Sequence, residues 1–129
     1  MTTTVFDIIS AGAPAATAIG APGANPQTYA GLKTLAERTV AALNERGIGR
    51  NDRVAIVLEN GPEMATAFLC IAAGATTAPL NPAYREDEFD FYLSDLNAKA
   101  LVVLYGSESA AVTVARKRGI PVKIGRAHV

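Results

Sequence analysis

The chain has 129 residues, the length of one domain or of one part of a larger domain. Half of the residues are hydrophobic and 19% are charged, so the composition predicts a packed core and excludes a disordered chain. Twelve Lys and Arg residues balance twelve Asp and Glu residues without a basic cluster, so we expect no nucleic-acid partner.

The first part of the chain alternates short elements with turns. Residues 4–11 are predicted to form a helix, and residues 17–19 and 27–29 a hairpin around a turn rich in Gly, Pro and Asn. From residue 30 to residue 46 the hydrophobic period becomes helical, and Gly47 is placed to end this helix. Its apolar stripe consists of Leu32, Leu35, Ala36, Val40 and Leu43.

The next two elements are strongly apolar. Residues 53–58 form a continuous apolar run, which is typical of a strand covered on both faces. A helix is predicted over 64–73, with Asn60 as its N-cap and Pro62 near its first position. This helix is apolar on nearly every side, as is typical of a helix inside a larger body.

The rest of the chain continues the alternation of strands and helices. Acidic residues Glu86, Asp87 and Glu88 are expected to open a helix, and Ser107 or Ser109 to cap another that ends at Arg118. Strands are predicted at 76–80, 100–104 and 120–122. The alternation predicts an α/β fold with a mainly parallel sheet and flanking helices.

Three features of the chain concern its location and its end. The first ten residues do not form a signal peptide, and no run reaches the ~20 apolar residues of a membrane span, so we expect a cytoplasmic chain without a membrane partner. Residues 124–129 resemble the translation of a common sequencing-adapter oligonucleotide. We therefore expect native sequence at 1–123 and a non-native tail at 124–129; the alternative is a short native strand. His128, the only histidine, lies in this tail and is given no role.

Several partial motifs do not amount to a catalytic site. Residues 47–52 begin like a dinucleotide fingerprint, but they lack the third glycine and lie between a helix and a strand in the wrong order. No Gly-rich phosphate loop ending in Lys-Ser or Lys-Thr is present. Residues 105–109 stand at a strand-to-helix turn, where helix capping is the favoured role and neither serine has nucleophile-elbow spacing.

The remaining reactive side chains also have structural explanations. Cys70, the only cysteine, excludes an internal disulfide and lies among apolar residues, so we expect a buried thiol with a raised pKa. The carboxylates from Glu86 to Asp90 fit a solvated helix face better than a metal site. We assign no catalytic, cofactor-binding or metal-binding residue in this chain.

The order and spacing of several segments nevertheless resemble a known family. Residues 28–32, 46–48 and 52–56 are similar to the start of the AMP-forming adenylating superfamily, which includes acyl-CoA synthetases. Residues 60–64, 68–69, 73–75 and 79–84 are similar to its second core motif. The resemblance runs from about residue 5 to residue 122. Residues 78–84 and 88–95, with Phe89 and Phe91, are most similar to the oxalate–CoA ligase branch; Asn51 departs from the glycine of many relatives, but it tolerates the same turn.

This resemblance implies that the chain is the first subdomain of the large N-terminal domain of an acid–CoA ligase. Members of the family join a carboxylic acid to ATP with Mg²⁺, release pyrophosphate, and pass the acyl group to CoA. The longer enzyme that would contain this chain is called the parent below. Its implied partners are therefore a small acid, ATP and CoA. The family's phosphate loop, magnesium-binding glutamate and catalytic lysine all lie beyond residue 129, so the chain alone is expected to be inactive and to bind none of these cofactors.

Two alternatives stay open. Some relatives place an arginine against the 3′-phosphate of CoA, two positions before Arg85, where this chain has Ala83; a solvated arginine at a helix start is the favoured role of Arg85. The chain could also be a complete α/β binding module without catalysis. Reading the parent DNA beyond codon 123 distinguishes this alternative from a fragment of a longer enzyme.

Overall fold

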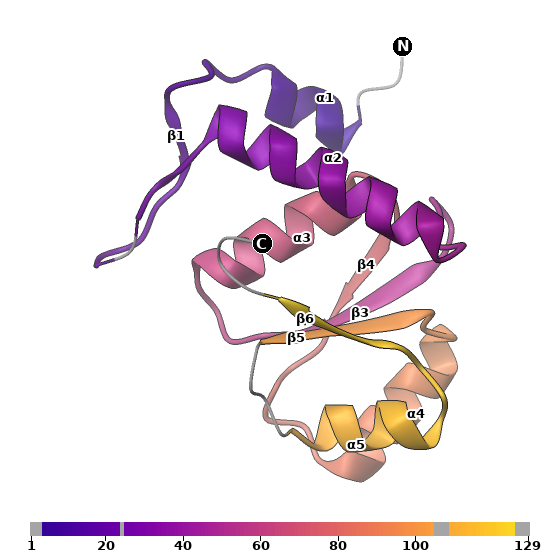
Figure 1. The fold of residues 1–129 in the computed structure, drawn as a ribbon. Helices are drawn as coiled ribbons and strands as arrows, with labels where there is room; N and C mark the ends of the chain where they lie inside the picture. Colours follow the sequence, from indigo (N-terminus) through magenta and orange to yellow (C-terminus); the bar gives the residue numbers. More distant parts are fainter. Residues whose placement is uncertain (1–3, 24, 105–108, 126–129) are drawn as a thin grey trace.

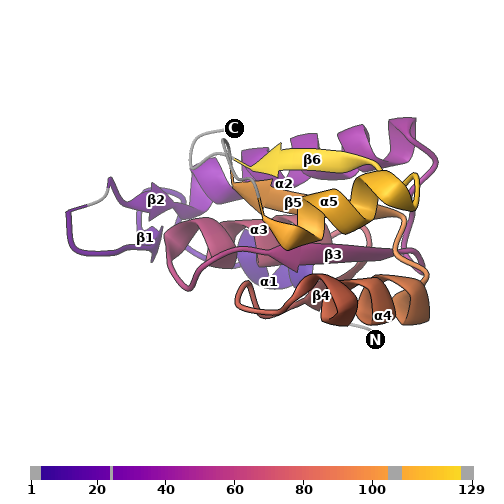
Figure 2. The ribbon, with the colours of Figure 1, turned by 90° about the horizontal axis from the view of Figure 1, so that it is seen from below.

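The structure, a computed structural model, describes residues 4–23, 25–104 and 109–125, and it contains two sheets. The larger sheet has four strands in the order β4-β3-β5-β6, all parallel to their neighbours. Its two central strands are β3 and β5, with Ala55 opposite Leu101 and Ile56 opposite Val102. The smaller sheet is an antiparallel hairpin of β1 and β2, which projects beyond the end of the larger sheet (Figures 1 and 2).

The elements follow the alternation that the sequence predicts. The helices are α1 (Val5–Ser10), α2 (Tyr29–Glu45), α3 (Pro62–Ala72), α4 (Glu86–Leu96) and α5 (Ala110–Lys117). The strands are β1 (Thr17–Ile19), β2 (Gln27–Thr28), β3 (Arg53–Val57), β4 (Thr76–Pro79), β5 (Ala100–Leu104) and β6 (Val122–Gly125). The prediction of a mainly parallel α/β sheet is confirmed.

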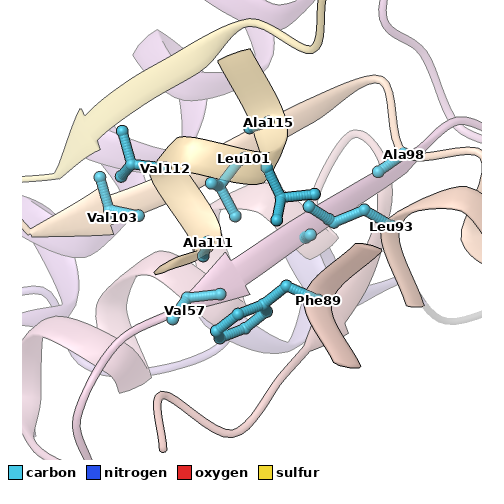
Figure 3. Close-up of a cluster of buried hydrophobic side chains, with 11 residues drawn as sticks. Val57, Phe89, Leu93, Ala98, Leu101, Val103, Ala111, Val112 and Ala115 are labelled. Carbon is cyan, nitrogen blue, oxygen red and sulfur yellow. The ribbon is translucent and has the colours of Figure 1, made fainter. Parts of the chain in front are cut away.

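The sheet carries helices on both faces because its central strands are apolar on both faces. Helices α4 and α5 cover one face (Figure 1), and α3 covers the other together with Leu43 at the C-terminal end of α2. Alternate side chains of β3 and β5 divide between the two sides. Figure 3 shows the core on the α4 and α5 side, where Val57, Leu101 and Val103 meet Phe89 and Leu93 of α4. The core on the other side contains Val54, Ile56, Leu58, Ala100, Val102 and Ile71.

A third layer lies over α3. Helices α1 and α2 pack on the side of α3 that faces away from the sheet, and Ile9, Leu32 and Ala36 bury Cys70 there. The apolar character of α3 on nearly every side therefore has a direct cause, since α3 lies between the sheet and α2. Phe68 is the large side chain of α3 that stays exposed, at 39%.

The structure corrects two local predictions. Gly61, not Asn60, stands at the N-cap of α3, because Pro62 occupies the first helical position. The last strand runs over Val122–Gly125 instead of 120–122. The N–H of Ile120 donates to the carbonyl of Ala115 at 2.8 Å, so Ile120 belongs to the end of α5 and the strand begins after Pro121. The native boundary at residue 123 stays a prediction, which the parent DNA tests.

Candidate functional site

The topology defines one edge of the sheet as the place where a ligand is expected. Helix α3, which follows β3, lies on one face, whereas α5, which follows the neighbouring strand β5, lies on the other (Figure 1). The chain therefore leaves two adjacent parallel strands in opposite directions. In open α/β sheets, ligands bind in the crevice at the carboxyl ends of the strands at such a switch point.

The segment after β3 brings a helix N-terminus to this edge. Glu59 and Asn60 are exposed, and α3 begins at Pro62 with no side-chain hydrogen bond at its N-cap. Glu63 lies in the first turn of α3, where its negative charge is favourable to the helix dipole. This N-terminus is thus partly neutralised by the chain's own carboxylate.

The segment after β4 is a tight turn that leads into α4. The N–H of Ala83 donates to Oδ1 of Asn81 at 2.9 Å, and the N–H of Tyr84 donates to the Asn81 carbonyl at 3.1 Å. This is the Asx-type geometry for which Asn is favoured in turns. Arg85 is the N-cap residue of α4, and its N–H donates to Oε1 of Glu88 at 3.0 Å. The guanidinium of Arg85 is exposed, as the sequence predicts for an arginine at a helix start.

The segment after β5 reaches the same edge at Ser109. This residue is the N-cap of α5, as one of the two sequence alternatives predicts; the other, Ser107, lies outside the described residues. The Ser109 carbonyl accepts from the N–H groups of Val112 and Thr113 at 3.1 and 3.3 Å. Its Oγ atom is buried and has no hydrogen-bond partner among the described residues. A buried hydroxyl without a partner is unusual, and the sequence, which identifies Ser109 as a candidate helix cap, does not indicate this burial.

An aromatic group connects the turn after β4 to the core. The ring of Tyr84 stacks on that of Tyr92 with centroids 5.1 Å apart, and it meets the buried ring of Phe89 edge-on at 5.8 Å. A hydrogen bond to Tyr92 and the nearby Tyr92 and Glu88 side chains raise the pKa of Tyr84. Tyr84 therefore stays protonated and fixes the entry into α4 by packing.

The surroundings of Cys70 do not activate its thiol. It is 2% exposed, and burial raises the pKa of its thiol to about 11, although a hydrogen bond with Thr39 acts in the opposite direction. A thiol with this pKa is almost fully protonated near neutral pH and is a poor nucleophile. The predicted buried and unreactive cysteine is confirmed in its burial and in the direction of its pKa.

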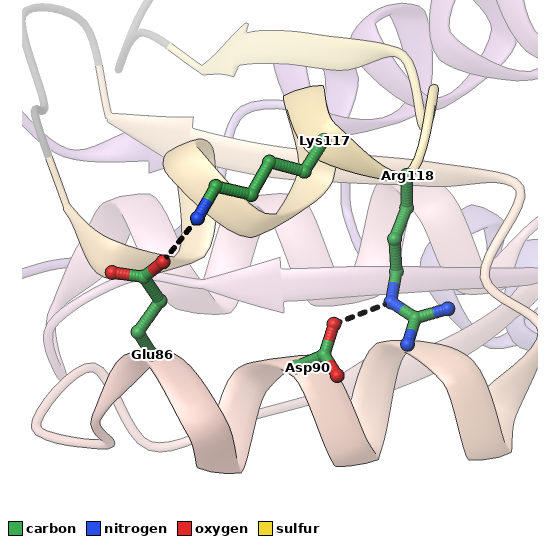
Figure 4. Close-up of polar contacts among 4 residues, drawn as sticks. All are labelled: Glu86, Asp90, Lys117 and Arg118. Atoms are coloured by element: carbon green, nitrogen blue, oxygen red, sulfur yellow. Dashed lines mark hydrogen bonds and ion pairs between the residues drawn. The ribbon is translucent and has the colours of Figure 1, made fainter.

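A hollow among the described residues lies at the other edge of the sheet. It is lined by residues that precede β5 and β6, among them Asn97, Lys99, Arg118 and Pro121. The C-terminal ends of α4 and α5 border it, and Arg118 is already paired with Asp90 at 2.7 Å (Figure 4). This hollow is therefore separate from the switch point at the carboxyl ends.

The described residues bring no set of metal-binding side chains together. Within residues 4–23, 25–104 and 109–125, no group of three His, Cys, Asp or Glu side chains is placed to hold a metal ion. Glu86 and Asp90 form ion pairs with Lys117 and Arg118 of α5, both at 2.7 Å, so these carboxylates join two helices (Figure 4).

Among the residues that the structure describes, no helix has the length and apolar character needed to cross a membrane.

The sequence and the structure are both similar to those of adenylating enzymes. The chain is 41% identical over 92 residues to an oxalate–CoA ligase from Arabidopsis thaliana, a match that covers 70% of this chain and 18% of the relative. It is 40% identical over 86 residues to the long-chain-fatty-acid–CoA ligase FadD13 from Mycobacterium tuberculosis, covering 66% of this chain and 17% of the relative. The chain thus spans about a fifth of the length of these curated relatives.

Solved structures give the same result for the fold. The crystal structure of apo MatB from Rhodopseudomonas palustris is similar with a TM-score of 0.81 and 27% identity, over 98% of this chain and 27% of that chain. The sequence profile of the AMP-binding enzyme family matches residues 6–126, nearly the whole chain. The chain therefore belongs to the AMP-binding enzyme family, and its fold corresponds to part of an adenylating enzyme.

Proposed function

We propose that this chain is the first part of the adenylation domain of an acid–CoA ligase whose acid is oxalate or another small carboxylic acid. In the parent, a carboxylate oxygen attacks the α-phosphorus of ATP and displaces pyrophosphate. The thiolate of CoA then attacks the acyl carbon and displaces AMP. The observation that carries this proposal is the family match over residues 6–126, and the identity to oxalate–CoA ligase supports the choice of acid.

The role of this chain in the parent is to support the site. The switch point holds a helix N-terminus, the Asn81 turn and the Ser109 hydroxyl. The described residues bring together no group of three His, Cys, Asp or Glu side chains for Mg²⁺, and the sequence contains no Gly-rich phosphate loop ending in Lys-Ser or Lys-Thr. We therefore assign no step of the reaction to a residue of this chain. ATP, Mg²⁺ and CoA are proposed as ligands of the parent alone.

The acid is tested by measuring CoA-thioester formation by the full reading frame of the parent with a panel of acids. The panel contains oxalate, malonate, acetate and a long-chain fatty acid, because FadD13 is a relative of nearly equal identity. We expect the highest kcat/KM with oxalate or another short acid. A preference for the long-chain acid contradicts the choice of acid while leaving the reaction class intact.

A further inference from the structure

We draw no further inference here: the strongest candidate, the buried Ser109 hydroxyl at the N-terminus of α5, belongs to the sheet edge already described, and no second feature among the described residues indicates a ligand for it.

Discussion

Gly74, which follows the C-cap residue of α3, lies so close to Val40 of α2 that a Cβ atom on Gly74 would be 2.8 Å from Cγ2 of Val40. Real Cβ atoms essentially never approach another atom so closely, and the branched Val40 side chain has little freedom to move away. The absence of a side chain at position 74 therefore sets how closely α2 packs on the end of α3.

We expect Gly74→Ala to destabilise the chain by about 1–3 kcal/mol, the usual cost of forcing an extra methyl group into a packed interface. Urea unfolding of the wild type and the variant gives this difference directly. Gly49→Ala is the matched control, because nothing lies within 4 Å of a Cβ atom at position 49. Val40→Ala should remove most of the effect of Gly74→Ala in a double-mutant cycle; independent, additive effects would contradict the contact.

The ion pair of Asp90 with Arg118 should be visible as a pH effect. The hydrogen bond from Arg118 lowers the pKa of Asp90, so the pair stabilises the fold above the unfolded-state pKa of Asp90. This contribution is lost as the pH falls through the lower pKa of the folded state. NMR titration of the Asp90 carboxyl carbon should show an upward shift of its pKa in Arg118→Ala.

The control for this titration is Lys117→Ala, because Lys117 pairs with Glu86 and acts on the pKa of Asp90 only through a weaker charge attraction. Its effect on the pKa of Asp90 should be smaller than that of Arg118→Ala. Equal shifts in the two variants would show that Asp90 responds to the general charge of α5 and not to the 2.7 Å hydrogen bond with Arg118.

Cys70 should react slowly with a thiol reagent in the native chain. Its thiol is buried between α3 and α2, and its pKa of about 11 leaves little thiolate near neutral pH. Labelling should become rapid in denaturant, and the rate in native buffer should rise when Gly74→Ala loosens the same interface. Rapid labelling of the native wild type would contradict the packing of α1 and α2 on α3.

The sequence predicts the alternation of elements well because each carries its own local signal. The apolar run from Val54 to Leu58 indicates a buried strand, and the stripe from Leu32 to Leu43 indicates a helix. The spatial order β4-β3-β5-β6 has no such signal, since it depends on how the crossovers pack. The switch point between β3 and β5 follows from that order, which is why sequence reasoning did not find Ser109 as a buried polar group of the site.

Local sequence pattern also does not identify the packing partners of α3 and α4. The apolar surface of α3 predicts that something covers it, but only the structure identifies α2 and α1 as the cover. In α4, the spacing from Phe89 to Leu96 predicts the core face, whereas the stacking of Tyr92 on Tyr84 is seen only in the structure. Local pattern therefore predicts which residues are buried better than it predicts their partners.

We propose that this chain supports an adenylating enzyme and does not itself carry out adenylation. ATP–pyrophosphate exchange with oxalate and other small acids tests it most directly, on the isolated chain and on the parent expressed from the full reading frame. We expect exchange by the parent and no exchange above a buffer blank by the isolated chain. Exchange by the isolated chain, after a mock purification has excluded a contaminating ligase, would contradict it.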